Sequence, residues 1–286
     1  MDVVTAPATQ QPVERPPLGA LSPSRVSDFK TCPLLFRFRA VDRLPEPPSP
    51  EATRGTLVHT VLEQLYDLPA EQRTPPAAHR LAVAAWEAIV AADPSLVAMV
   101  GPDDAEEWLR SVRDLLDTYF TLEDPRRLEP ADRELLVEVE LDDGLRLKGV
   151  LDRLDASPAG ELRVVDYKTG RSPHPLFEQR ALFQLRFYAL LLWRARGHVP
   201  RLLQLIYLAD GQVVRLEPHE ADLRALERTL RAVAAAIERA FQTHDFRARR
   251  SALCGWCPHQ ALCPEFGGTP PPLPTGSGAD EPEATT

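Results

Sequence analysis

The sequence is poor in cysteine, in long apolar runs and in excess positive charge. Four cysteines in 286 residues are too few for a disulfide scaffold, and clustered thiols in a reducing compartment more often bind metal. No run of about 18 consecutive apolar residues predicts a membrane span. The N-terminus also lacks the basic segment followed by an apolar one that marks a signal peptide. We therefore expect a cytoplasmic protein with no membrane partner.

The net charge of −9 at pH 7 argues against a generally basic nucleic-acid-binding protein. The last 20 residues carry three acidic and no basic residues, and the first 20 contribute a further −1, which leaves −5 for residues 21–266. Metal-site carboxylates would add negative charge locally, and arginine-rich stretches such as FRARR could line a channel. The charge is therefore a mark against DNA as a partner but does not exclude it.

Both ends of the chain are rich in Pro, Gly, Ser and Thr, which predicts disordered arms at residues 1–20 and 267–286. Between them we expect one domain. Ser22 followed by Pro23 predicts the start of a helix, and Cys32-Pro33 interrupts it. A proline-rich loop, LPEPPSPEATRG, then precedes a helix whose apolar residues recur at helical spacing. Two further helices are expected at about 77–92 and 103–122.

The apolar period then changes to two. The stretches LLVEVEL, LRLKGVLDRLDA and LRVVDYKTG, separated by tight turns, predict an antiparallel meander. A helix at about 175–196, the strands RLLQLIYLA and VVRLE, and a helix at about 220–241 follow. This order predicts an α/β fold with a mixed β-sheet core flanked by helices. A helical insertion at about 67–130 would precede the sheet, and a cysteine-bearing segment at 250–266 would follow it.

Two of the predicted strands carry charged residues in apolar surroundings. Asp166 and Lys168 are two residues apart, so both side chains leave the same face of their strand. Asp152 follows an apolar run in the neighbouring strand, and the short turn can place it beside Asp166. A buried carboxylate is costly unless it is paired or bound to a cation. A divalent cation would relieve the repulsion, while a salt bridge between Lys168 and one aspartate is the simpler alternative.

Two predicted helices present polar pairs at a spacing of four residues. His59 and Glu63 share one face and could direct a nitrogen and an oxygen at the same metal, although a single histidine on a half-apolar helix is commonly only packed or exposed. Gln184 and Tyr188 place an amide and a phenol on one side of the later helix. Tyr188 fits a core position equally well.

The ordered set SPSRVSDFKTCP, GTLVH, GVLDRLD, VVDYKTG, QLRFY and the closing cysteines resembles the PD-(D/E)XK nuclease superfamily, and within it the RecB-like exonuclease branch. The resemblance covers nearly all of residues 21–266 and implies a restriction-endonuclease-like fold. The functional residues that it implies are the metal ligands His59, Asp152 and Asp166, the catalytic Lys168, and the supporting residues Gln184 and Tyr188 near the DNA strand. Glu63 and Glu138 are further candidates. Leu151-Asp152 replaces the usual Pro-Asp dipeptide.

Phosphodiester hydrolysis requires a nucleophile near neutral pH and neutralisation of the charge that builds on the phosphate. Mg²⁺ or Mn²⁺ held by carboxylate oxygens supplies both, and a histidine ligand slightly favours Mn²⁺. An ammonium group at Lys168 would orient the attacking water and stabilise the pentacoordinate phosphate.

The sequence CGWCPHQALC contains Cys254, Cys257 and Cys263, and a tetrahedral metal site or an iron–sulfur cluster needs a fourth ligand. Cys32, 222 residues before Cys254, is the remaining cysteine, although it could be a buried small hydrophobic residue while His259 completes a zinc site. The cysteine pattern alone favours zinc. The RecB-like resemblance implies instead a [4Fe-4S] cluster held by all four cysteines, which would fasten the first helix to the C-terminal segment.

The resemblance implies a metal-dependent DNA exonuclease that acts on single-stranded ends in recombination and repair. Because the sequence has no G-x-x-x-x-G-K-[ST] loop, a helicase partner would be a separate protein. A CRISPR-associated nuclease that trims spacer DNA is an alternative within the same class. Two alternatives from other classes are a non-catalytic DNA-binding scaffold and a zinc-bearing interaction protein that binds no nucleic acid.

Overall fold

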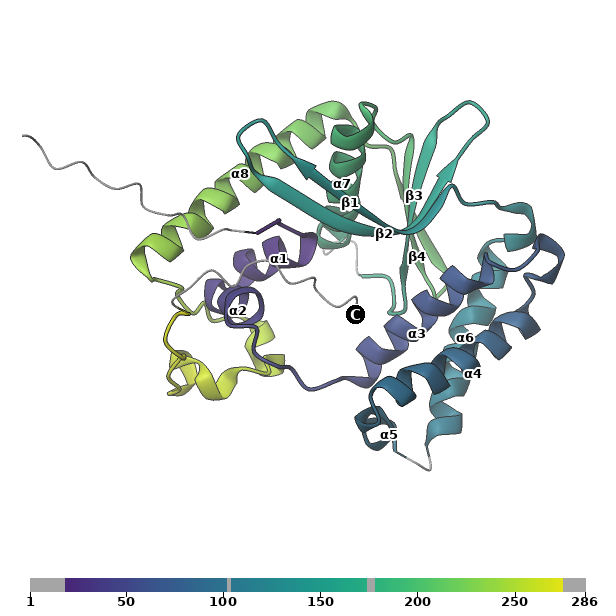
Figure 1. The fold of residues 1–286 in the computed structure, drawn as a ribbon, viewed down its shortest axis with the longest axis horizontal. Helices are drawn as coiled ribbons and strands as arrows, with labels where there is room; N and C mark the ends of the chain where they lie inside the picture. Colours follow the sequence, from purple (N-terminus) through teal and green to yellow (C-terminus); the bar gives the residue numbers. More distant parts are fainter. Residues whose placement is uncertain (1–18, 102–103, 174–177, 275–286) are drawn as a thin grey trace, which may run out of the picture.

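A five-stranded sheet runs through the molecule in the order β1-β2-β3-β4-β5 (Figure 1). The computed structural model describes residues 19–101, 104–173 and 178–274, without the side chains of 178–181. The strands are β1 (Asp132–Glu140), β2 (Arg146–Ala156), β3 (Leu162–Lys168), β4 (Leu202–Tyr207) and β5 (Gln212–Leu216). β3 and β4 are parallel, and the other neighbouring strands are antiparallel. The predicted mixed sheet flanked by helices is confirmed.

Most helices precede the sheet. They are α1 (Pro23–Thr31), α2 (Pro33–Phe36) with a π-helical turn (Arg37–Val41), α3 (Pro50–Leu65), α4 (Pro75–Ala92), α5 (Ser95–Val100) and α6 (Ala105–Leu122). α7 (Glu178–Arg196) connects β3 to β4, and α8 (Glu220–Thr243) follows β5. Cys254 lies in the short 3-10 helix η5 (Ala252–Trp256), Cys257 directly follows it, and Cys263 directly follows the 3-10 helix η6 (Gln260–Leu262). Among the described residues, none of the helices combines the length and apolar character needed to cross a bilayer.

Helix α3 begins earlier than the sequence pattern predicts. The Ser49 hydroxyl accepts a hydrogen bond from the Ala52 backbone N–H at 3.1 Å, and Pro50 occupies the first turn. The prediction of a loop through residue 55 is therefore wrong, because a serine followed by proline is as good a helix start as it is a loop signal. The same signal at Ser22 and Pro23 correctly predicts the start of α1.

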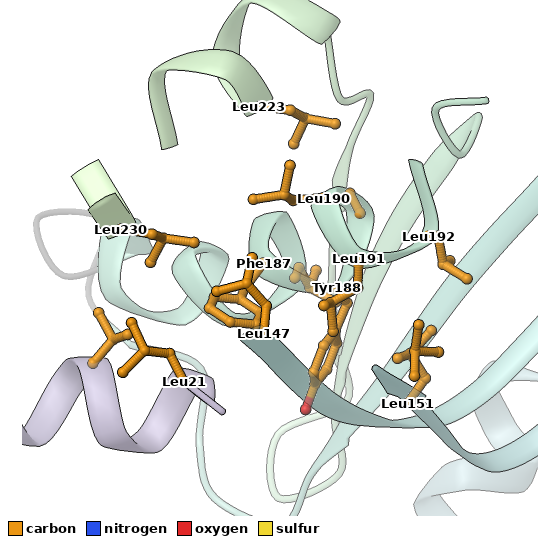
Figure 2. Packing of buried hydrophobic residues seen from close by; sticks show 14 of the residues in the cluster. Leu21, Leu147, Leu151, Phe187, Tyr188, Leu190, Leu191, Leu192, Leu223 and Leu230 are labelled. Carbon is orange, nitrogen blue, oxygen red and sulfur yellow. The ribbon is translucent and has the colours of Figure 1, made fainter. Parts of the chain in front are cut away.

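The two faces of the sheet carry separate cores. On one face α7 packs against β1 and β2, with α8 outside it, and Leu147, Leu151 and Phe187 lie at this contact (Figure 2). On the other face α3, α4 and α6 form the second core (Figure 1). Successive residues of β3 alternate between them, with Val164 in the α7 core and Val165 in the α3 core.

The strands β2 and β3 pair over only part of their length. Their ladder ends where Arg153 faces Val165. Beyond that point β3 continues beside β4, and β2 continues beside β1. The next facing positions are Asp152 and Asp166, where the two strands diverge. We call this divergence, with its two aspartates, the β2–β3 fork.

The N-terminal chain covers part of the β2 edge that the fork leaves open. The Leu21 N–H donates to the Arg146 carbonyl at 2.8 Å, and the Leu21 carbonyl accepts from the Lys148 N–H at 2.8 Å. The backbone N–H and C=O of Leu21 therefore form hydrogen bonds with β2 at a place where β3 is no longer paired with it.

The predicted N-terminal arm lies almost wholly outside the described residues, as does the predicted tail from residue 275. Residues 267–274 are described. Within them Arg37 donates a hydrogen bond to the Pro271 carbonyl, and Leu273 packs against the α7 core. The predicted domain boundary at residues 266 and 267 stays a prediction.

Gly149 lets α7 lie directly on β2. A Cβ atom at this position would lie 2.8 Å from Cε1 of Tyr188 and 3.0 Å from Cδ1 of Leu191, which is closer than such atoms approach. Figure 2 shows the Tyr188 ring extending from α7 among the leucines of this core. Glycine is therefore required at position 149 by packing rather than by backbone conformation.

The substitution Gly149→Ala is expected to destabilise the fold by about 1–3 kcal/mol, because the Tyr188 ring must move within a filled core. Gly170→Ala is a matched control, because Gly170 is exposed and a Cβ there meets nothing within 4 Å. Denaturant unfolding of both variants measures the difference. Equal midpoints for the two variants would contradict the packing role of Gly149.

Candidate active site

Asp152 and Asp166 both lie buried at the β2–β3 fork. Their side chains are 9% and 1% exposed. Oδ2 of Asp152 accepts a hydrogen bond from the Tyr167 backbone N–H at 2.7 Å, so this carboxylate takes the place of a strand partner. Leu151 and Leu154 are three residues apart and yet both pack in the α7 core, so the alternation of β2 breaks at Asp152. This break lets the carboxylate bind β3.

Glu134 of β1 occupies the position across from Asp152. The neighbouring pairs are Arg133 with Arg153 and Leu135 with Leu151. Glu134 has φ 44°, the left-handed region that non-glycine residues seldom adopt. Such a conformation costs of order 1–3 kcal/mol and is typical of functional sites.

His59 of α3 approaches both carboxylates. Its Nδ1 lies 3.5 Å from Oδ2 of Asp152 and 3.8 Å from Oε1 of Glu134. Its Nε2 lies 3.2 Å from the Tyr167 carbonyl oxygen. One ligand atom from each of His59, Glu134 and Asp152 lies within 4.8 Å of the others, which is close enough for one metal ion. Two strands and a helix from a distant part of the sequence therefore converge here.

The charges at the site perturb each other's protonation. Burial alone would lower the pKa of His59, but the neighbouring carboxylates of Glu134, Asp152 and Asp166 outweigh it and raise that pKa to about 9. Burial and the facing Asp166 raise the pKa of Asp152, although His59 and Lys168 oppose this. The crowded carboxylates thus favour a bound cation, whether a proton or a metal.

Lys168 pairs with Asp166. Its Nζ is 2.7 Å from Oδ2 of Asp166 and donates a hydrogen bond to Oε1 of Gln184 at 2.9 Å. Nε2 of Gln184 in turn donates to the Tyr188 hydroxyl at 2.6 Å. Burial lowers the pKa of Lys168, but the charges of Asp166 and Asp152 outweigh it and raise the pKa, which keeps the ammonium charged. The sequence-predicted pair on α7 therefore contacts the predicted lysine.

The residues present fit a hard divalent cation. The two carboxylates and one imidazole provide oxygen and nitrogen ligands of the kind that Mg²⁺ and Mn²⁺ accept. Both carboxylate oxygens of Asp166 are buried, and the Lys168 ammonium at 2.7 Å from Oδ2 is the cation that the described part of the chain places beside them. One ion pair leaves this carboxylate with oxygen lone pairs that a metal ion can use.

The glutamate that lies nearest to His59 and Asp152 is Glu134, which is neither of the two that the sequence suggests. Glu63 lines the pocket at His59, together with Glu134 and Asp152. Glu138 lies exposed in β1, does not line this pocket, and faces Lys148 in the ladder. Glu134 was missed, because its place opposite Asp152 follows only from the strand register. Counting the ladder back from the Asp142-Asp143-Gly144 turn would have identified it.

Arg153, the neighbour of Asp152 in β2, is 1% exposed and forms a polar network with tyrosines and acids. It donates to both carboxylate oxygens of Glu123 at 2.8 and 3.0 Å and to the Tyr66 hydroxyl at 3.1 Å. It also donates to the Tyr167 hydroxyl and to Asp155. Because Arg153 follows Asp152 and Tyr167 follows Asp166, this network fixes both arms of the fork from the α3 side.

The four cysteines lie together, far from the fork in sequence and beside α1 and α2. All four line one partly open pocket. Sγ of Cys32 accepts a hydrogen bond from the Arg249 backbone N–H at 3.3 Å, and Sγ of Cys254 accepts one from the Ser251 N–H at 3.3 Å. Burial raises the pKa of Cys263, and the three other thiols add to that shift.

His259 has other partners. Its side chain is 4% exposed, and its Nε2 lies 2.8 Å from Oε1 of Glu46. Its ring packs edge-on against Phe38 with centroids 5.2 Å apart. These contacts explain why the histidine is buried without assigning it to a metal.

Removing the carboxylate in Glu123→Ala is expected to destabilise the protein by about 1–3 kcal/mol, because the buried Arg153 keeps Asp155 but loses both of its hydrogen bonds to Glu123. Glu129→Ala is the matched control. Glu129 pairs with the buried Arg73, but its side chain is 76% exposed and Arg73 keeps its carbonyl partners, so about 0–1 kcal/mol is expected. Thermal unfolding compares the two variants. Similar losses of thermal stability in both variants would show that the buried Arg153 network stabilises the fold no more than the exposed pair does.

The comparisons with known proteins agree with this geometry. The model of the PD-(D/E)XK nuclease superfamily matches residues 20–264. No curated protein matches the sequence significantly. A solved structure of a candidate exonuclease from Eubacterium rectale superposes with a TM-score of 0.56 and 14% identity, covering 88% of this chain and 94% of that chain. At that identity the likeness shows the fold alone.

A second solved structure, SSO0001, has a TM-score of 0.37 and 16% identity over 84% of this chain and 85% of that chain, and no argument rests on it. The family model covers most of the described domain, including the fork, α3, α7 and the late cysteines. The chain therefore belongs to the PD-(D/E)XK nuclease superfamily.

Proposed function

We propose that this protein is a metal-dependent DNA exonuclease that hydrolyses phosphodiester bonds at single-stranded ends in recombination and repair. The observation that carries the proposal is the convergence of His59, Glu134 and Asp152 next to the Asp166–Lys168 pair. Membership of a nuclease superfamily supports hydrolysis of nucleic acid. The preference for single-stranded ends and a separate helicase partner come from the sequence resemblance.

The residues at the fork have distinct proposed roles. His59, Glu134, Asp152 and Asp166 would hold Mg²⁺ or Mn²⁺. When bound, such an ion supplies a water nucleophile near neutral pH and neutralises charge on the phosphate. Lys168 would orient the attacking water and stabilise the negative charge that develops on the phosphate oxygens. Gln184 holds the Lys168 ammonium by its side-chain oxygen and is itself held by Tyr188.

We also propose that the four cysteines hold a [4Fe-4S] cluster. All four thiols line one pocket, and four cysteine thiolates are the ligand set of such a cluster. The engagement of Nε2 of His259 with Glu46 argues against a zinc site completed by that nitrogen.

Lys168→Ala is expected to lower hydrolysis at least about 100-fold, because it removes one charge-stabilising donor from the transition state. The assay uses 5′- and 3′-labelled single- and double-stranded DNA with Mg²⁺ or Mn²⁺, and EDTA should abolish cleavage. Lys148→Ala is the control lysine variant. DNA binding in Ca²⁺ should be unchanged in both.

Cleavage by Lys168→Ala at the wild-type rate would refute the role of this lysine. Binding of DNA by the wild-type protein without any metal-dependent cleavage would favour the non-catalytic scaffold instead.

Protein purified without oxygen is expected to be brown, with broad visible absorption and about four irons per chain, as a [4Fe-4S] cluster requires. Cys32→Ser should bleach the colour and destabilise the fold, because the first helix loses its bond to the C-terminal segment. His259→Gln should keep the colour. Colourless wild-type protein with one zinc per chain would overturn the cluster.

A further inference from the structure

The segment that carries the late cysteines presents large apolar side chains to solvent. Of the six large hydrophobic residues that are exposed in the described part of the chain, three lie within residues 250–266, namely Leu253, Trp256 and Phe266. Trp256 is 81% exposed, more than any of the other five. It does not line the cysteine pocket, so a group held by the thiols would leave its ring uncovered.

These side chains and two arginines form one surface, which we call the Trp256 patch (Arg249, Arg250, Leu253, Trp256 and Phe266). Leu253 and Trp256 are three residues apart in the 3-10 helix η5, which has three residues per turn, so both leave the same side of it. Leu253, Phe266 and Arg249 line the cysteine pocket together. The Arg250 guanidinium lies 5.6 Å from the centroid of the Phe266 ring.

The turn that carries Trp256 is held by its own hydrogen bonds. The Ser251 hydroxyl accepts from the Leu253 N–H at 3.2 Å, and Sγ of Cys254 accepts from the Ser251 N–H at 3.3 Å. Nε2 of Gln260 donates to the Cys254 carbonyl at 2.6 Å. A ligand that covers Trp256 therefore meets an ordered backbone, which lowers the entropic cost of binding.

The arginines bring positive charge to the patch of an acidic protein. The chain has a net charge of −9, yet residues 247–256 contain three arginines and no acidic residue. Arg247 pairs with Asp245 at 2.7 Å. Arg249 donates to a backbone carbonyl of α1, and Arg250 lies over an aromatic ring. Within the described residues, neither of these two exposed guanidinium groups pairs with a carboxylate.

Exposed aromatic rings beside guanidinium groups have the chemistry that binds single-stranded nucleic acid. Every base has a face that stacks on an aromatic ring, and arginines contact the phosphates between the bases. In a duplex these faces are already stacked on one another, so a single strand is the form that offers them. A protein partner would also use tryptophan and arginine, but two guanidinium groups without carboxylate partners favour a polyanion.

We propose that the Trp256 patch binds single-stranded DNA outside the β2–β3 fork, with Trp256 stacked on a base and Arg249 and Arg250 on neighbouring phosphates. Figure 1 shows the cysteine segment, in yellow, beside α1 and α2 and away from β3. The inference rests on the proposed nuclease function and adds a second contact with the substrate strand. Because Trp256 positions the strand without touching the cleaved phosphate, its loss raises KM and changes kcat at saturating DNA little.

Equilibrium binding of a labelled oligo(dT) strand in Ca²⁺ tests the proposal. Trp256→Ala is expected to weaken binding about 10-fold, as the loss of one stacked base does. Trp256→Phe keeps a ring and should restore most of the affinity. Leu136→Ala on β1 is the matched control, because it removes another exposed apolar side chain and should leave the affinity unchanged.

An abasic strand of the same length separates stacking from charge, because it keeps the phosphates and lacks the bases. Trp256→Ala should bind this strand as well as the wild-type protein does. Arg250→Met should weaken binding to both strands and reduce the slope of log K against log salt by about 0.7, the value for one phosphate of a single strand. Equal losses of Trp256→Ala on both strands would overturn the stacking contact.

Stability and self-association distinguish the other uses of the patch. Because Trp256 is exposed, Trp256→Ala should not lower the thermal midpoint, and a large drop would assign the residue to the fold and overturn the proposal. A dimer that dissociates in Trp256→Ala while DNA affinity is unchanged would assign the patch to a second copy instead. If the wild-type protein neither binds nor cleaves DNA, the proposed function fails and the inference fails with it. Wild-type cleavage with an unchanged Trp256→Ala affinity would reject the inference alone.

Discussion

The separation of β2 from β3 is the constraint on which the candidate site depends. Two strands that stayed paired would point their aspartates at neighbouring positions of a flat sheet and satisfy their backbones with each other. Here the Asp152 carboxylate binds the Tyr167 N–H instead, and Leu21 serves the open edge of β2 further along. Some of the backbone groups freed by the divergence are thus satisfied, and the space between the strands is left to side chains that carry charge.

Two groups of opposite charge balance meet at the fork. Carboxylates gather around one imidazole and one ammonium, so negative charge is in excess and a cation is favoured. The single guanidinium of Arg153 is enclosed by Glu123, Asp155 and tyrosine hydroxyls, so its charge is already paired. Asp152 and Arg153 are adjacent in β2 and line the same pocket, so the paired guanidinium network can hold the geometry of the carboxylates beside it.

Sequence reasoning placed side chains on a common face where residue spacing alone decides it, although the local Ser49-Pro50 signal was interpreted as a loop rather than as the start of α3. Asp166 and Lys168 share a strand face by their spacing, and Gln184 and Tyr188 share a helix face by theirs, and the structure brings the two pairs into contact. It failed where the signal depended on register or on strain. Glu134 is matched with Asp152 only once the ladder is aligned, and its left-handed backbone leaves no trace in hydrophobic periodicity. Arg153 reads as an ordinary exposed strand residue until α3 and α6 cover it.

The contact between the two ends of the domain has a consequence for its biosynthesis. Phe36 of α2 stacks on Phe246, and Cys32 receives its N–H donor from Arg249. At about 5–20 residues per second, the ribosome needs roughly 10–40 s to make the chain between such partners. Throughout that interval the nascent helix pair has its aromatic side chains without the partners that cover them in the finished fold. The first ordered segment to be translated is consequently among the last to reach its native neighbours.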